Sequence, residues 1–320
     1  MDRPVFLISF DCEGKWGVAD GITDHYRNTL TNRNLNLAYQ RLVDILDNRG
    51  IKATFAFVGA FTMSFDEYQE NRFLFNDILI DGKNWLANFR SDMAMNDYDG
   101  WFNPMPFELV KSRQRHEIAS HGFSHLPLGE NLISEEDFLL EMSSVSKLSE
   151  LKSSSFKTFV YPRNIVGYPH MLGASGFIGY RDSLYDEGTK LKRIRDWFSE
   201  LNIMQSAQAH GRTEQNIVKI PPAYFLNWRA NLRKRIPLSV TVHRWHNIIK
   251  KGIENSGVIH LTSHPQDFIA GNDQYHLFDE ILKFIVNKQM NGEILNLTLS
   301  EYSNNIVRKI HKRKAGGACY

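Results

Sequence analysis

Residues 5–13 read VFLISFDCE, and this stretch decides the fold class. Its first six residues are almost continuously apolar, which is typical of a strand buried on both faces of a parallel sheet. Asp11 and Glu13 follow at once, and residues two apart in an extended segment point to the same side. We therefore expect both carboxylates to face one site, one as a metal ligand and one as a general base. The alternative is an ordinary strand end with helix-capping acids.

Three further polar clusters follow apolar runs in the same way. They read SHGFSH at 120–125, YPRN at 161–164 and SHP at 263–265. Parallel strands bring their carboxyl ends to one edge of a sheet or barrel, where active sites collect. Four such clusters predict one active site at the rim of a parallel barrel.

His121 and His125 are the candidate metal ligands. Side chains at this spacing on one turn or tight loop point the same way and can share one ion. With one carboxylate they form a His₂-carboxylate set, which leaves positions open for water and substrate. These ligand types suit Zn²⁺, and also Co²⁺, Ni²⁺, Fe²⁺ or Mn²⁺.

Arg163 and His264 are the candidates for the remaining catalytic roles. Arg163 follows Tyr161-Pro162, and a buried arginine beside a carboxylate keeps it ionised and oriented. We expect it to face Asp11, with Arg181 at the next strand end as an extension of the same network. An imidazole such as His264 can donate a proton to a leaving amine near neutral pH.

Strand and helix patterns alternate along the whole chain, which predicts one α/β domain with a mainly parallel sheet. This domain is expected over 1–305, with an insert at about 60–115 and a basic, flexible tail at 306–320. Helices are expected over 34–49, 134–151, 171–174 and 278–289, and a last helix from Ser300. Strands are expected over 5–10, 53–58, 117–120, 158–161, 178–180, 258–262 and 294–298.

The insert is rich in aromatic residues, among them Trp85, Phe89 and Trp101. They either cover the barrel or form a lid that stacks on sugar rings. Trp16, Tyr161 and Trp101 are the candidate substrate contacts.

The composition of the 320 residues is that of an ordinary soluble protein, with 42% hydrophobic and 23% charged residues. A net charge of +2 gives no reason to expect a nucleic-acid partner. The two cysteines, Cys12 and Cys319, offer no disulfide framework, and the first apolar run is too short for a signal peptide. A cytoplasmic location is therefore expected.

The stretch 229–251 is strongly basic and contains no acid. It forms either a solvated helix face or a contact with an anionic glycan, a lipid-linked sugar or the inner membrane surface.

Taken together, the four clusters resemble the motifs of the polysaccharide deacetylases of the NodB-homology type, carbohydrate esterase family 4. The resemblance covers most of the chain, from residue 5 to about 268. One motif departs from the family, whose commonest form has adjacent aspartates, because the second acid here is Glu13. The motifs are matched by residues 9–13, 121–125, 161–164 (in altered order) and 261–265.

The resemblance implies a distorted (β/α)₇-type barrel and removal of an acetyl group from a sugar. It implies that His121 and His125 bind metal, that Asp11 is the base and that Arg163 tunes it. His264 is then the acid. We assign the third metal ligand to Glu13, with Asp11 as the alternative. The variant motifs look like the branch associated with surface polysaccharide and O-antigen biosynthesis.

The sequence therefore predicts a metal-dependent deacetylase, most readily an N-deacetylase, acting on a surface polysaccharide or its lipid- or nucleotide-linked precursor. Two other functions remain open. One is hydrolysis of a non-sugar amide, formamide or ureide on the same scaffold, and the other is glycan binding without catalysis. The oligomeric state is not predicted.

Overall fold

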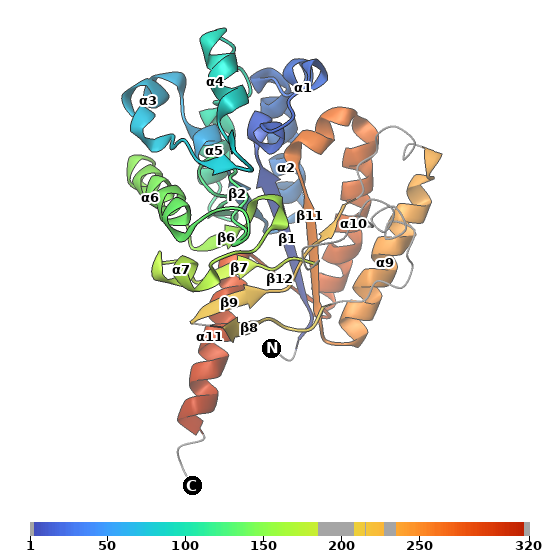
Figure 1. Cartoon of the computed structure of the whole chain (residues 1–320). Helices are drawn as coiled ribbons and strands as arrows, with labels where there is room; N and C mark the ends of the chain where they lie inside the picture. The colour runs from blue at the N-terminus through green and yellow to red at the C-terminus, as the bar shows by residue number, and fades with distance from the viewer. Residues whose placement is uncertain (1–2, 185–207, 215, 227–234, 317–320) are drawn as a thin grey trace.

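The computed structural model describes residues 3–184, 208–214, 216–226 and 235–316. Most of its strands form one large curled sheet (Figure 1), and β3 (Leu79–Ile80) and β4 (Lys83–Asn84) form a separate two-stranded antiparallel sheet. The strands of the large sheet are β1 (Val5–Cys12), β2 (Thr54–Phe57), β5 (Glu117–Ser120), β6 (Thr158–Val160), β7 (Gly179–Arg181), β8 (Arg212–Glu214), β9 (Ile217–Ile220), β10 (Tyr224–Phe225), β11 (Val258–Ser263) and β12 (Leu295–Leu297).

The strand order is β10-β11-β1-β2-β5-β6-β7-β9-β8, with β12 also paired to β1. Every pairing in this sheet is parallel except β8 with β9. The predicted α/β fold with a mainly parallel, barrel-like sheet is therefore confirmed. Strand β1 lies near the centre, so its carboxyl end is flanked by the ends of β2 and β11.

Four of the long helices lie where the sequence predicts them: α2 (Asn32–Arg49), α6 (Glu135–Leu151), α10 (Asn272–Met290) and α11 (Leu299–Gly316). Helix α2 ends at Gly50, whose φ of 66° is left-handed. Ser134 and Asp137 form a capping box at the start of α6. The remaining longer helices are α4 (Ala87–Ala94), α5 (Pro104–Lys111) and α9 (Leu238–Glu254), with short helices α1 (Asp24–Thr29), α3 (Phe65–Glu70) and α7 (Pro169–Ala174).

The two faces of β1 explain its unbroken apolar sequence. Phe6, Ile8 and Phe10 belong to a large core with residues of α2, α9 and α10, whereas Val5 and Leu7 belong to a second core with residues of α11. Both sides of the strand are thus buried. The expected boundary at residue 305 falls inside α11, where Ile306 is buried.

The insert at 60–115 packs its own aromatic core against the barrel. Phe75, Phe89 and Phe102 contact one another, and Phe75 also contacts Phe123 beside the paired histidines. Phe89 and Phe102 are almost completely buried. These rings cover the barrel, which is the first of the two expectations for this segment, and offer no face for stacking on a sugar.

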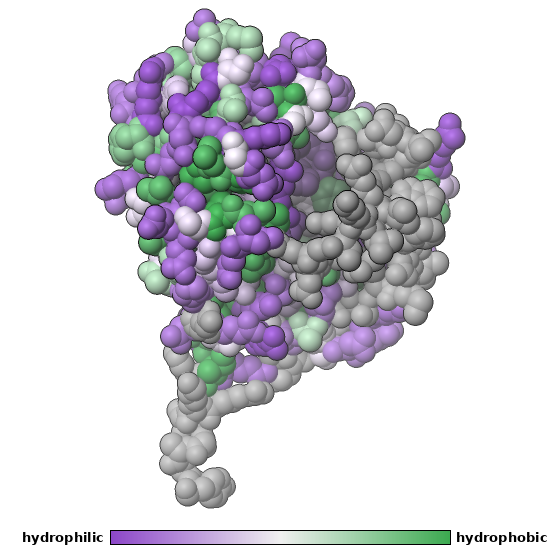
Figure 2. All heavy atoms as spheres, viewed as in Figure 1, coloured by the Kyte–Doolittle hydropathy of each residue, from purple (hydrophilic) through white to green (hydrophobic). Residues whose placement is uncertain are grey.

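In the coloured part of the face shown in Figure 2, hydrophilic residues predominate, and a group of apolar residues lies among them. Within the described parts of the chain, no helix combines the length and the apolar character needed to cross a bilayer.

Candidate active site

The carboxyl ends of four parallel strands bring the predicted site residues together. Phe10 pairs with Ser263, and Phe57 pairs with both Cys12 and Ser120. The residues that follow these positions are therefore neighbours in space. As predicted, Asp11, Glu13, His121, His125 and His264 meet at one edge of the sheet.

Glu13, His121 and His125 form a compact, buried group. Oε1 of Glu13 lies 3.3 Å from Nε2 of His121 and 3.2 Å from Nε2 of His125. The three candidate ligand atoms lie within 4.8 Å of one another. All three residues are at most 7% exposed. Two imidazole nitrogens and one carboxylate oxygen thus converge, as a His₂-carboxylate metal site requires.

The hydrogen bonding of the two imidazoles leaves their Nε2 atoms available. Nδ1 of His121 lies 2.7 Å from the carbonyl oxygen of Val160, so Nδ1 carries the ring proton. Nε2 of the same ring therefore keeps the lone pair that can bind metal. Among the described residues, both ring nitrogens of His125 are buried without a hydrogen-bond partner. Burial lowers the pKa of His125, which favours the neutral ring that binds metal. The residues therefore fit a divalent metal.

Asp11 has different surroundings, because Arg181 holds both of its carboxylate oxygens. The two Asp11–Arg181 hydrogen bonds are each 2.6 Å long. Arg181 also donates to Ser9, Thr262 and Asn164 and is 2% exposed. Burial would raise the pKa of Asp11, but the guanidinium outweighs burial and the pKa lies below its ordinary value.

The prediction that Arg163 faces Asp11 is therefore wrong. Arg163 donates to the carboxylate of Asp20 and the carbonyl of Gly17, and it is exposed. Its φ of 60° lies in the left-handed region, in a turn that carries the side chain away from Asp11. Arg181, at the end of β7, makes the contact instead, and its place at the end of an apolar strand was the sequence signal for it.

His264 lies at the open side of the group, with its side chain 30% exposed. Its Nε2 is 3.6 Å from Oε1 of Glu13, and its Nδ1 is 3.2 Å from Oδ2 of Asp267. Burial alone would lower the pKa of His264, but the carboxylates of Glu13 and Asp267 outweigh burial and raise it to about 10. His264 is thus placed and charged as a proton donor.

The pKa of Glu13 responds to the same contacts in the opposite sense. Burial would raise the pKa of Glu13, but His264 and His125 outweigh burial and hold this pKa well below its usual range. The second oxygen of Glu13 accepts a 3.0 Å hydrogen bond from Gln266, which the sequence did not single out. Both oxygens of Glu13 are therefore held in place.

The three aromatic candidates for substrate contact lie in the core. Trp16 and Trp101 are 0% exposed and Tyr161 is 1% exposed. Trp16 donates to the carbonyl of Trp101, and Tyr161 donates to the carbonyl of Gly167. Because neither face nor edge of these rings is available, the expectation that they contact substrate is corrected.

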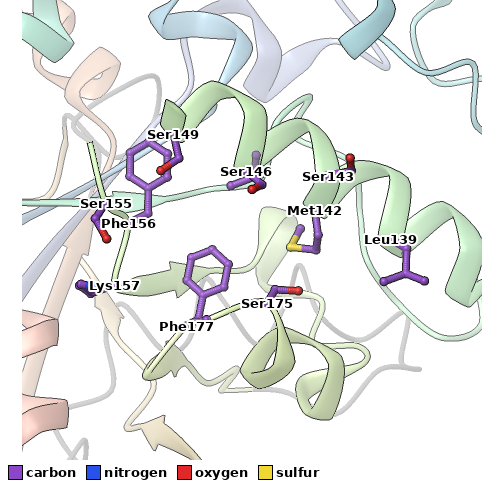
Figure 3. Close-up of a pocket in the computed structure, with 12 residues that line it drawn as sticks. Leu139, Met142, Ser143, Ser146, Ser149, Ser155, Phe156, Lys157, Ser175 and Phe177 are labelled. Carbon is purple, nitrogen blue, oxygen red and sulfur yellow. The ribbon is translucent and has the colours of Figure 1, made fainter. Parts of the chain in front are cut away.

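A separate groove of about 590 Å³ lies between α6 and the segments that precede β6 and β7. Figure 3 shows its floor of Met142, Phe156 and Phe177 and its rim of serines. Residues 155–157 and 175–177 come before β6 and β7, so the groove lies at the amino ends of strands. It is not part of the site at the carboxyl ends.

The basic stretch at 229–251 falls partly outside the described residues, since 227–234 are not described. Its remaining members lie on or next to α9, where Arg244 is buried and Lys250 is exposed. Contact of this stretch with a membrane or a lipid-linked sugar stays a prediction.

Solved structures share the whole fold with this chain. One is of a protein assigned as a polysaccharide deacetylase from Mycobacterium smegmatis, with 14% identity, a TM-score of 0.61 and coverage of 96% of this chain and 92% of that one. Another is of a protein with the same assignment from Pseudomonas aeruginosa PAO1, with 11% identity, a TM-score of 0.55 and coverage of 95% and 90%. No protein-family model matches the chain, and no curated protein matches it. The chain therefore has the fold of these two proteins assigned as polysaccharide deacetylases.

Proposed function

We propose that this protein is a metal-dependent hydrolase that removes an acetyl group from a sugar. One observation carries the proposal: two acids two residues apart have different partners in one buried site. Oε1 of Glu13 faces imidazoles and its Oε2 accepts only from the neutral amide of Gln266, while Arg181 holds both oxygens of Asp11. One carboxylate is thus free to complete a metal site, and the other is held as an ionised base.

The proposed metal ligands are Glu13, His121 and His125. A divalent metal such as Zn²⁺, or Co²⁺, Ni²⁺, Fe²⁺ or Mn²⁺, would polarise the acetyl carbonyl and acidify a water molecule there. Glu13 is preferred over Asp11 as the third ligand because the bidentate contact with Arg181 already takes both Asp11 oxygens.

Asp11 and His264 are the proposed proton-transfer residues. Asp11 accepts a proton from the attacking water through a lone pair that Arg181 leaves free. His264 donates a proton to the departing amine or alkoxide, and Asp267 orients its ring. Arg181 keeps Asp11 ionised and pointed into the site.

The shared fold supports an acetylated glycan as substrate. An N-acetylated sugar of a surface polysaccharide, or of its lipid- or nucleotide-linked precursor, is the proposed class. A cytoplasmic location, with peripheral contact at the inner membrane face, would match such a precursor and is part of the proposal.

The test is acetate release by the Zn²⁺-loaded protein from N-acetylated and O-acetylated glycan oligomers. Asp11→Asn should lower the rate by about 10²- to 10⁴-fold, the range for loss of a proton-transfer group. His125→Ala should also lower the rate, because it removes a proposed metal ligand. His170→Ala changes an exposed histidine of α7 and should leave the rate unchanged.

Acetate release that survives both substitutions would overturn the proposed mechanism. Metal and glycan binding without any acetate release would instead identify a glycan-binding protein. Hydrolysis restricted to formamides or cyclic ureides in the same assay would replace the sugar substrate with a small amide.

A further inference from the structure

The five residues of the histidine segment 121–125 take an unusual backbone path. Gly122 has a φ of 75° and His125 a φ of 58°, both in the left-handed region. A non-glycine residue in this region costs about 1–2 kcal/mol, so the surroundings must hold the segment in place. The two proposed metal ligands are therefore presented by a segment that would not adopt this shape alone.

The three carbonyl groups between the two histidines all accept hydrogen bonds from other parts of the fold. The N–H groups of Gly59 and Ala60 donate to the carbonyls of Gly122 and Phe123. The indole of Trp85 donates to the carbonyl of Ser124 at 2.9 Å. The insert thus fixes one side of the segment.

A single buried side chain, Glu141 of α6, accepts from two of the N–H groups between the two histidines. Its Oε1 accepts from the backbone of Phe123 at 2.7 Å and of Ser124 at 2.8 Å. Its Oε2 accepts from the hydroxyl of Ser124 at 3.1 Å. Glu141 is 2% exposed, a burial that an acid seldom reaches without such partners.

Gly122 makes this approach possible. A Cβ added at Gly122 would lie 3.0 Å from Oε1 of Glu141 and 3.3 Å from a ring carbon of Pro162. A side chain at this position would therefore press on the carboxylate that binds the next two residues. The position of the Glu141 carboxylate therefore depends on a glycine at residue 122.

We infer that Glu141 is a positioning residue that sets the geometry of the paired histidines, and so tunes metal affinity without touching the metal. The inference rests on the proposed metal site. Without the carboxylate, the N–H groups of Phe123 and Ser124 lose their acceptor, and the strained segment can relax, which moves His125 relative to His121.

The test is Co²⁺ binding, followed by its visible absorption spectrum, together with thermal unfolding of each metal-free variant. Glu141→Leu should weaken Co²⁺ binding about 10- to 100-fold, as loss of an outer partner of a metal ligand does, and should alter the spectrum. Glu141→Gln keeps an oxygen that can accept both N–H groups and should restore affinity to within about threefold. If Glu141→Leu does not fold, Glu141→Asp, whose shorter side chain cannot reach both N–H groups, takes its place with the same expected direction.

Ser144→Ala is the matched control. Ser144 is buried on the same helix and donates to the carbonyl of Leu74, away from the histidines. This change should lower the unfolding temperature but leave the affinity and the spectrum unchanged.

Wild-type affinity and spectrum in a folded Glu141→Leu or Glu141→Asp variant would overturn the inference. A wild-type protein that binds Co²⁺ but releases no acetate would overturn the proposed activity and leave the inference standing. A wild-type protein that binds no Co²⁺ would overturn the metal site and the inference together.

Discussion

The site has two halves that differ in what faces the acid at their centre. The arginine half holds Asp11 with Arg181, and the histidine half holds Glu13 with His121, His125 and His264. A guanidinium keeps its charge at every ordinary pH, whereas an imidazole can be neutral and offer a lone pair. One short motif with two acids can therefore serve two kinds of chemistry, because the fold gives each acid a different neighbour.

Exchange of each acid for its amide should separate the two halves most strongly. We expect Glu13→Gln to weaken Zn²⁺ binding by more than about 100-fold, beyond the usual effect of an outer-shell change. Asp11→Asn should keep the affinity within about tenfold while acetate release falls by about 10²- to 10⁴-fold. Metal titration and rate measurement on the same preparations would check both.

The reverse result, with metal binding lost in Asp11→Asn and kept in Glu13→Gln, would exchange the roles of the two halves. Equal loss in both variants would mean that the acids bind metal together, as the group of Asp11, Glu13 and His264 would allow.

The arginine half should also contribute far more to stability than the exposed pair of Arg163 with Asp20. Arg181→Met leaves the buried carboxylate of Asp11 uncompensated, and we expect a loss of about 3–5 kcal/mol in the free energy of unfolding. Arg163→Met removes an exposed ion pair and should cost at most about 1 kcal/mol. Urea unfolding of both variants measures the difference.

Asp11→Asn combined with Arg181→Met should recover part of the loss, since the unpaired charge is gone. Similar losses for the two single arginine variants would show that the buried pair adds no more than a surface contact.

The smallest expected effect is on the pH dependence of stability, which the histidine half controls in the metal-free protein. The folded pKa of His264, about 10, lies above its ordinary value of 6.5. A raised pKa means that the proton stabilises the fold fully below pH 6.5 and that this contribution is lost as the pH rises to about 10. Solvent screening at this 30% exposed ring reduces the contribution, so the unfolding temperature of the metal-free protein should fall over this range by only a few degrees more than that of His264→Gln, at roughly 2–4 °C per kcal/mol.

Added Zn²⁺ should shrink that difference, because a cation beside Glu13 disfavours a charged imidazole. Parallel pH profiles of the metal-free wild type and His264→Gln would show instead that Glu13 does not hold a proton on His264.

The sequence predicted the residues that local patterns report. Apolar runs followed by polar clusters located Asp11, Glu13, His121, His125 and His264, because parallel strands end at a common edge. The same reasoning chose Arg163 over Arg181, since both follow apolar strands and only the left-handed turn at Arg163 separates them. A hydrophobic pattern does not predict the backbone conformation of a single residue.

Other parts of the site depend on contacts between distant segments. Glu141 lies 18 residues from Phe123, in the middle of a helix where an acid normally faces water. The aromatic residues of the insert suggested a sugar surface, yet mutual packing buries them, as large rings usually prefer. Neither outcome follows from spacing along the chain.

The pairing of β1 with β11 has a consequence for how the molecule is made. Thr262 donates to the carbonyl of Ser9 across 253 positions, and Asp11 meets Arg181 across 170. Contacts of such separation form late, after the entropy of closing a long loop has been overcome. Pairing of β11 with β1 brings His264 and Gln266 to Glu13, whereas Arg181 reaches Asp11 from β7. A nascent chain that has not yet reached β11 lacks His264 and therefore has only part of the site.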